Sequence, residues 1–160
     1  MRLYHGSTVD IDVIDFSFSK PNKDFGKGFY LSADRHQAEE MAAYKAFQMN
    51  KPPVVNVYDF DAQCMSDGSL NVKLFDGYSE EWANFVFGNR MSDNGGSIHQ
   101  YDIVYGPIAN DRVGLQIRRY MEHEISFEIF LERLKYMKGV TYQYFFGTQR
   151  AINQLKKIYE

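Results

Sequence analysis

The residues best suited to chemistry lie in two short segments near the beginning of the chain. His5-Gly6-Ser7 combines an imidazole, a glycine and a hydroxyl group, and Gly26-Lys27-Gly28 leads directly into a short aromatic segment that contains Tyr30. Glycine has no Cβ, so its backbone can pass close to a ligand. We therefore expect a ligand pocket in which both segments and Tyr30 take part.

Two arginines further along the chain are candidates for binding phosphate groups. A planar guanidinium can donate two parallel hydrogen bonds to phosphate oxygens, and Arg90 and Arg112 could act in this way. Lys27 could reach phosphate groups from the glycine segment. For all three residues, a surface ion pair or a solvated charge is the alternative interpretation.

The other histidines give no comparable signal. His123 lies between Glu122 and Glu124, but no second histidine follows at helical spacing, so we expect no metal site. We interpret His36 and His99 as residues without a role in the site.

The composition is that of an ordinary folded domain. A length of 160 residues predicts a single domain over residues 1–160. A hydrophobic content of 44% excludes a disordered chain, and a formal net charge of −3 gives no overall basic surface for nucleic acid. With Cys64 as its only cysteine, the chain has no disulfide framework.

No apolar segment resembles a signal peptide or is long enough to span a bilayer, so we expect a cytoplasmic protein, unless an export route without such a signal delivers it.

The elements that must position these residues predict an α+β domain, because strands are separated by helices. Branched and aromatic residues predict strands at 2–5, 28–32, 54–60, 101–105 and 141–148, with a shorter strand or extended link at 70–75. Apolar spacing and capping residues predict helices at 37–47, 79–88, 111–122 and 126–136, and a closing amphipathic helix at 149–159. Several large aromatic residues are most simply read as core: Tyr4, Trp82, Phe85 and Phe145.

The two N-terminal segments resemble the first two NAD-binding motifs of the ADP-ribosyltransferase superfamily, in its poly-ADP-ribose-polymerase-like (diphtheria-toxin-like) branch. The resemblance rests on His5-Gly6-Ser7 and on Phe25-Gly26-Lys27-Gly28-Phe29-Tyr30, followed by Ala33-Asp34 and a helix. A third strand of that branch carries a glutamate. The matching segment here, Thr141–Phe146, carries Gln143 at that position.

This resemblance implies a role for each matching residue. His5 would hydrogen-bond the ribose on the adenosine side of NAD, the Gly6 backbone would bind the nicotinamide amide, and Tyr30 would stack on the nicotinamide ring. Ser7 would support the pocket and Gly28 would border its nicotinamide side. His5, Tyr30 and Gln143 form the expected catalytic trio, with NAD as co-substrate and no metal.

The glutamine changes what the third strand can do. Gln143 could still bond a ribose hydroxyl, but it is neutral and cannot act as a base at neutral pH. It also lacks the charge that would stabilise a cationic transition state. The alternative is that Glu122 or Glu124 supplies the carboxylate from the preceding segment.

The whole chain also resembles an uncharacterised bacterial family, domain-of-unknown-function family 3990. That resemblance rests on Trp82, Phe85-Val86, Asn89-Arg90 and the segment Tyr101–Val113. Together the two resemblances imply a split antiparallel β-sheet sandwich with flanking helices, which binds NAD in a cleft between its sheets.

The leading hypothesis is a bacterial mono-ADP-ribosyltransferase that modifies a macromolecule, either a protein or a nucleic acid. By analogy with small catalytic domains of this kind, it could be the toxin of a toxin–antitoxin pair with a neutralising protein partner. The second hypothesis is a pseudoenzyme that binds NAD or ADP-ribose without chemistry. A third, the NAD-using RNA 2′-phosphotransferase relative, would need several arginines around a phosphate, and no basic cluster is evident.

Overall fold

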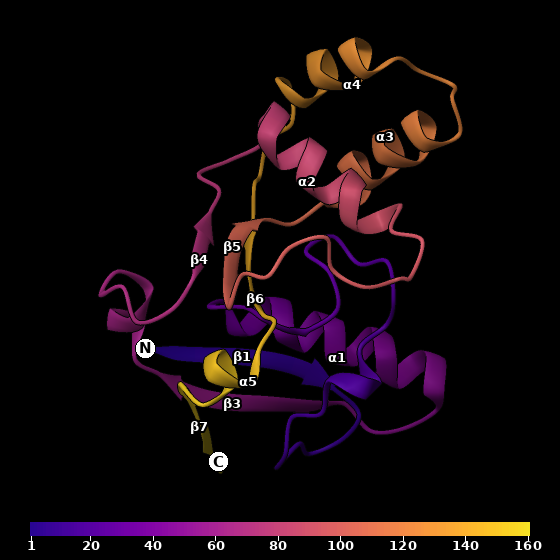
Figure 1. Cartoon of the computed structure of the whole chain (residues 1–160). Coiled ribbons are helices and arrows are strands. Elements are labelled where there is room, and N and C mark those ends of the chain that lie inside the picture. The colour runs from indigo at the N-terminus through magenta and orange to yellow at the C-terminus, as the bar shows by residue number, and fades with distance from the viewer.

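Two β-sheets form the centre of the protein, and helices cover their outer faces (Figure 1). The computed structural model describes all 160 residues. The smaller sheet has the strand order β1-β3-β7 and the larger has the order β2-β6-β5-β4. The strands are β1 (Arg2–Ser7), β2 (Phe29–Leu31), β3 (Val54–Phe60), β4 (Val72–Leu74), β5 (Ile103–Pro107), β6 (Tyr142–Phe146) and β7 (Leu155–Ile158).

Five α-helices connect these strands, together with two short 3-10 turns at Phe16–Phe18 and Ala62–Met65. The helices are α1 (Arg35–Met49), α2 (Glu80–Arg90), α3 (Asp111–Met121), α4 (Phe127–Leu134) and α5 (Gln149–Ile152). Side-chain caps explain why the four longer helices begin where they do, since each cap accepts a hydrogen bond from a backbone N–H of the first turn. These caps are Asp34, Ser79, Asn110 and Ser126.

The two sheets and the helices form four layers with two hydrophobic cores. One core lies between the sheets and contains Leu3 and Tyr58 from the smaller sheet and Phe146 from the larger. The other lies between the larger sheet and α2, α3 and α4, where Phe145 packs with Trp82. Because both faces of the larger sheet are covered, its strands are apolar or aromatic at almost every position. The helix α1 covers the outer face of the smaller sheet (Figure 1).

A single β-bridge joins the two sheets edge to edge. Tyr4 of β1 and Ser32, just after β2, exchange backbone hydrogen bonds of 2.8 and 2.9 Å. Beyond this bridge, β1 stays with β3 and β2 stays with β6, so the strands separate. All strand pairs are antiparallel except β4 with β5. The expected α+β class with two mainly antiparallel sheets is therefore confirmed.

Most predicted elements are present, but the closing helix at 149–159 is wrong. Only Gln149–Ile152 is helical, and Leu155–Ile158 is a strand that pairs with β3. The spacing of Ala151, Ile152 and Leu155 is compatible with a helix. The chain forms a strand at Leu155–Ile158 instead because the edge of β3 is open for pairing. The helix predicted at 79–88 continues to Arg90, and the strand predicted at 101–105 spans Ile103–Pro107. None of the helices has the length and apolar character required to cross a bilayer.

Candidate functional site

The three strands that carry His5, Tyr30 and Gln143 lie next to one another at the junction of the two sheets. β1 meets β2 through the Tyr4–Ser32 bridge, and β2 pairs with β6 so that Tyr30 lies opposite Phe145. Gln143 precedes Phe145 by two residues and therefore lies on the same face of the sheet as Tyr30. The structure thus places the three strands of the predicted trio next to one another, with Tyr30 and Gln143 on one face of the larger sheet and the His5 ring stacked on Phe29 of the other face.

His5 fills the space where β1 and β2 begin to separate. Its Nδ1 lies 2.7 Å from the backbone carbonyl of Tyr30, and its ring stacks on Phe29 with centroids 4.3 Å apart. A carbonyl oxygen can only accept, so Nδ1 carries the proton and Nε2 has a free lone pair. Burial, reinforced by the nearby charge of Lys45, lowers the pKa of His5 to about 4. His5 is therefore a neutral imidazole at physiological pH, able to accept a hydrogen bond through Nε2.

Gly6 is required by the packing of α1. A Cβ at this position would overlap the backbone of Ala38 and Ala42, so only glycine lets the helix lie so close to β1. The Gly6 carbonyl accepts a 2.7 Å hydrogen bond from the ammonium group of Lys45. This contact places a partly buried positive charge beside His5.

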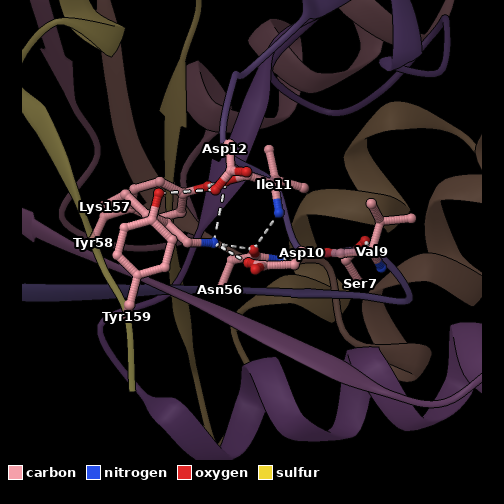
Figure 2. Close-up of polar contacts among 9 residues, drawn as sticks. All are labelled: Ser7, Val9, Asp10, Ile11, Asp12, Asn56, Tyr58, Lys157 and Tyr159. Atoms are coloured by element: carbon pink, nitrogen blue, oxygen red, sulfur yellow. Dashed lines mark hydrogen bonds and ion pairs between the residues drawn. The ribbon is translucent and has the colours of Figure 1, made fainter.

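Ser7 begins a segment that is held tightly against the smaller sheet. Its hydroxyl accepts a hydrogen bond from the backbone of Val9. Lys157 of β7 then binds the Asp10 carboxylate at 2.6 Å, the Ile11 carbonyl at 3.1 Å and the Asn56 side chain at 2.5 Å, as Figure 2 shows. The C-terminal strand therefore fixes the loop that leaves the His5 strand.

Tyr30 presents its ring, and not its hydroxyl, to the surroundings of the site. The hydroxyl donates a 2.6 Å hydrogen bond to the Gly26 carbonyl and accepts one of 3.1 Å from the Phe25 backbone. Burial raises the pKa of this phenol well above its usual range. The ammonium group of Lys23 lies over the ring, 4.0 Å from its centroid.

The glycine segment wraps around the Tyr30 hydroxyl and is anchored on both sides. Gly26 adopts a φ of 100°, which a residue with a side chain rarely reaches. The backbone N–H groups of Lys27 and Gly28 donate to the hydroxyls of Ser97 and Ser19, each at 3.0 Å. The Lys27 side chain itself is exposed.

Of the two candidate arginines, Arg90 already has a partner. Its guanidinium binds the Asp24 carboxylate at 2.6 Å, and the side chain of Asn89 donates to the Asp24 carbonyl. The end of α2 therefore clamps the start of the glycine segment. Arg112 is exposed in the first turn of α3.

The third strand offers an amide in a half-buried position. Gln143 lies opposite Gly106 of β5, and a Cβ at position 106 would come within 3.1 Å of the Phe25 and Phe75 side chains. The alternative carboxylates, Glu122 and Glu124, are exposed at the connection between α3 and α4. This connection belongs to the helical layer, which packs on the face of the larger sheet that Phe145 and Gln143 share (Figure 1).

His99 has a structural role that the sequence did not reveal. Its Nδ1 accepts a hydrogen bond from the Tyr101 backbone, so Nε2 carries the proton and donates to the Phe25 carbonyl at 2.6 Å. Burial lowers its pKa. His99 thus ties the glycine segment to the loop that precedes β5.

A cavity of about 500 Å³ opens beside this loop. Its lining includes Ser97, His99, Phe145 and Thr148, but none of His5, Tyr30 and Gln143. Phe145 separates the two places, because its ring contacts both Tyr30 and His99. The size is within the range of small-molecule pockets. Nowhere do three or more metal-binding side chains gather closely enough to hold a metal ion.

Sequence reasoning missed the two lysines closest to the trio, Lys23 and Lys45. One signal could have revealed Lys45: it follows Ala38 and Ala42 at helical spacing, so it lies near the face of α1 that touches Gly6. No periodic pattern predicts the position of Lys23, because the few residues between it and Tyr30 form an irregular turn.

A protein-family model described as "Protein of unknown function (DUF3990)" matches residues 1–157. No match is found among curated proteins. The matched range includes His5, Tyr30 and Gln143, together with all five helices.

Proposed function

The chain belongs to the DUF3990 family, and from that premise we propose that it is a mono-ADP-ribosyltransferase, which transfers ADP-ribose from NAD to a macromolecule and releases nicotinamide. The observation that supports this proposal is that the strands carrying His5, Tyr30 and Gln143 are neighbours at the junction of the sheets. The split of the two sheets at this point is also what an ADP-ribosyltransferase-like sandwich requires.

Each residue has a chemical property that suits its proposed role. The free Nε2 of neutral His5 accepts a hydrogen bond from a ribose hydroxyl. The Tyr30 ring, braced through its hydroxyl, offers a flat face to nicotinamide. The Gln143 amide binds a hydroxyl of the second ribose.

The reaction breaks the bond between the nicotinamide nitrogen and ribose C1, and the bonding electrons leave with nicotinamide. Positive charge develops at C1, and the acceptor then forms a bond to C1 and loses its proton. Gln143 cannot take that proton, and the carboxylate that precedes the glycine segment, Asp24, is paired with Arg90. The proposed enzyme therefore turns over slowly or uses an acceptor that is already nucleophilic.

The same observation supports a second candidate function. A neutral amide in place of a base fits a pseudoenzyme that binds NAD or ADP-ribose and performs no transfer. The two candidates differ in one measurable property, the release of nicotinamide.

The acceptor is proposed to be a protein or a nucleic acid, and the protein itself to be a toxin neutralised by a protein partner. This part of the proposal rests on analogy with small catalytic domains that lack a targeting module. Capture of ADP-ribosylated product from a lysate would identify the acceptor.

Nicotinamide release from NAD by the purified protein, with a cell lysate as acceptor, tests the proposal. We expect release in the wild type and a loss of tenfold or more in His5→Asn and Tyr30→Leu, while the exposed controls His36→Asn and Tyr136→Leu match the wild type. Gln143→Glu should increase release, because it restores a base. NAD binding without release, converted to release by Gln143→Glu, would favour the pseudoenzyme. No NAD binding by any variant would refute both candidates.

A further inference from the structure

The Lys23 side chain is the least satisfied charged group around the candidate site. Its neighbours among the half-buried cations have oxygen partners: Lys45 donates to the Gly6 carbonyl, Lys157 to three oxygens and Arg90 to Asp24. The Lys23 ammonium group makes no such bond. Its contact is the π face of Tyr30, with the nitrogen 4.0 Å from the ring centroid.

The groups around Lys23 mostly oppose its charge. Lys45 of α1 and Lys20 of the same loop repel it, and Asp24 attracts it. Asp24, however, is already paired with Arg90 at 2.6 Å. On the β1 side, Lys23 faces the neutral imidazole of His5, which offers no compensating charge.

These surroundings destabilise the protonated form of Lys23. Burial, together with repulsion by Lys45, lowers the pKa of Lys23 to about 8. A cation over an aromatic ring is attracted by the ring electrons, whereas a neutral amine largely loses that attraction. The contact with Tyr30 is therefore strongest below about pH 8 and weakens above it.

We propose that Lys23 is a built-in competitor for the Tyr30 ring face, and that a planar ligand binds there only by displacing its ammonium group. This inference rests on the proposed function, because it takes the Tyr30 face as the place where nicotinamide stacks. It adds a residue that determines the affinity of the site and its response to pH. The cationic ring of NAD meets the same obstacle, since two positive groups cannot share one ring face.

Nicotinamide is the probe for the test, because it is uncharged between pH 6.5 and 9.5 and carries no phosphate. Its affinity should rise in the wild type by roughly three- to tenfold over this range, as Lys23 loses its proton. Lys23→Ala should bind it tightly at both pH values, because the ring face is open. Lys23→Arg should bind it weakly at both, because the guanidinium stays charged. The exposed control Lys51→Met should behave as the wild type.

A measurement without ligand checks the contact itself. The ε-methylene NMR signal that is lost in Lys23→Ala should be shifted upfield by the Tyr30 ring, return to its ordinary position in Tyr30→Leu, and titrate near pH 8. Adding nicotinamide or NAD should remove the upfield shift.

The outcomes separate this inference from the proposed function. If NAD binds the wild type and Lys23→Ala equally, and the Lys23 signal does not move, the competitor role is overturned while the proposed function stands. If Lys23→Ala binds nicotinamide more tightly than the wild type, the competitor role and the proposed function are both supported. If neither probe binds any variant, the proposed function fails and the competitor role fails with it.

Discussion

At the scale of single residues, His5 shows how a buried titratable group links function to stability. The hydrogen bond to Tyr30 and the stacking on Phe29 hold the ring in one tautomer, with Nε2 free. A site that is to bind a ribose hydroxyl needs this fixed lone pair. The same burial makes protonation costly.

Protonation of His5 should destabilise the fold as the pH falls. The folded pKa of about 4 lies below the ordinary value of 6.5, so the unfolded chain binds the proton first. Stability from this group is complete above pH 6.5 and is lost between pH 6.5 and 4, by an amount of about 3 kcal/mol. Denaturant unfolding at pH 7, 5.5 and 4.5 measures this loss. The free energy of unfolding should fall less steeply with pH in His5→Asn than in the wild type, and equally steeply in the exposed control His36→Asn. The same pH dependence in the wild type and both variants would contradict a lowered pKa for His5.

At the scale of elements, the end of α2 explains the Asn89-Arg90 pair better than a phosphate site does. Both side chains reach Asp24 and fix the loop that carries Lys23 and precedes the glycine segment. The ion pair between Arg90 and Asp24 is only partly exposed, with 28% of the Arg90 side chain and 15% of the Asp24 side chain accessible. A loop fixed in this way holds the Tyr30 hydroxyl as well.

Removing this clamp should loosen the glycine segment without unfolding the protein. Arg90→Met leaves Asp24 without a partner and should lower the free energy of unfolding by about 1–2 kcal/mol, reduced from a fully buried pair by solvent screening. Amide exchange should increase at Phe25–Gly28. The double variant Arg90→Met/Asp24→Asn should recover part of the loss, since no unpaired charge remains; a full additive loss would show that the pair is not coupled.

At the scale of the whole molecule, the two ends of the chain stabilise each other. β7 pairs with β3, β3 pairs with β1, and Lys157 extends across the sheet to the loop after β1 (Figure 2). Only 11% of the Lys157 side chain is exposed. The last strand therefore supports the strand that carries His5.

Lys157→Met should cost about 2 kcal/mol of stability, because Asn56 and the Ile11 carbonyl lose a buried donor. The exposed neighbour Lys156→Met provides the matched control and should change stability by less than about 0.5 kcal/mol. Thermal unfolding and amide exchange of residues 7–12 measure both effects. Unchanged exchange in that segment would mean that Lys157 does not hold it.

Local signals in the sequence were sufficient for most elements and for part of the site. The helix caps, the β-branched segment Val54–Phe60 and the apolar spacing of α2 to α4 depend on neighbours in the chain, and their predictions are confirmed. Local patterns also predicted that His5, Tyr30 and Gln143 lie on strands, which are β1, β2 and β6. Each of these features rests on residues within one turn or one strand.

Only the tertiary structure decided the features that depend on distant partners. Leu155–Ile158 is a strand because β3 has a free edge, and Arg90 is a clamp because Asp24 reaches it across 66 residues. Lys23 lies on the Tyr30 ring because the intervening loop turns back on itself, and no local pattern encodes that contact. Sequence by itself determined the residue types available for chemistry; packing between separate segments determined which of them are charged, paired or free to meet a ligand.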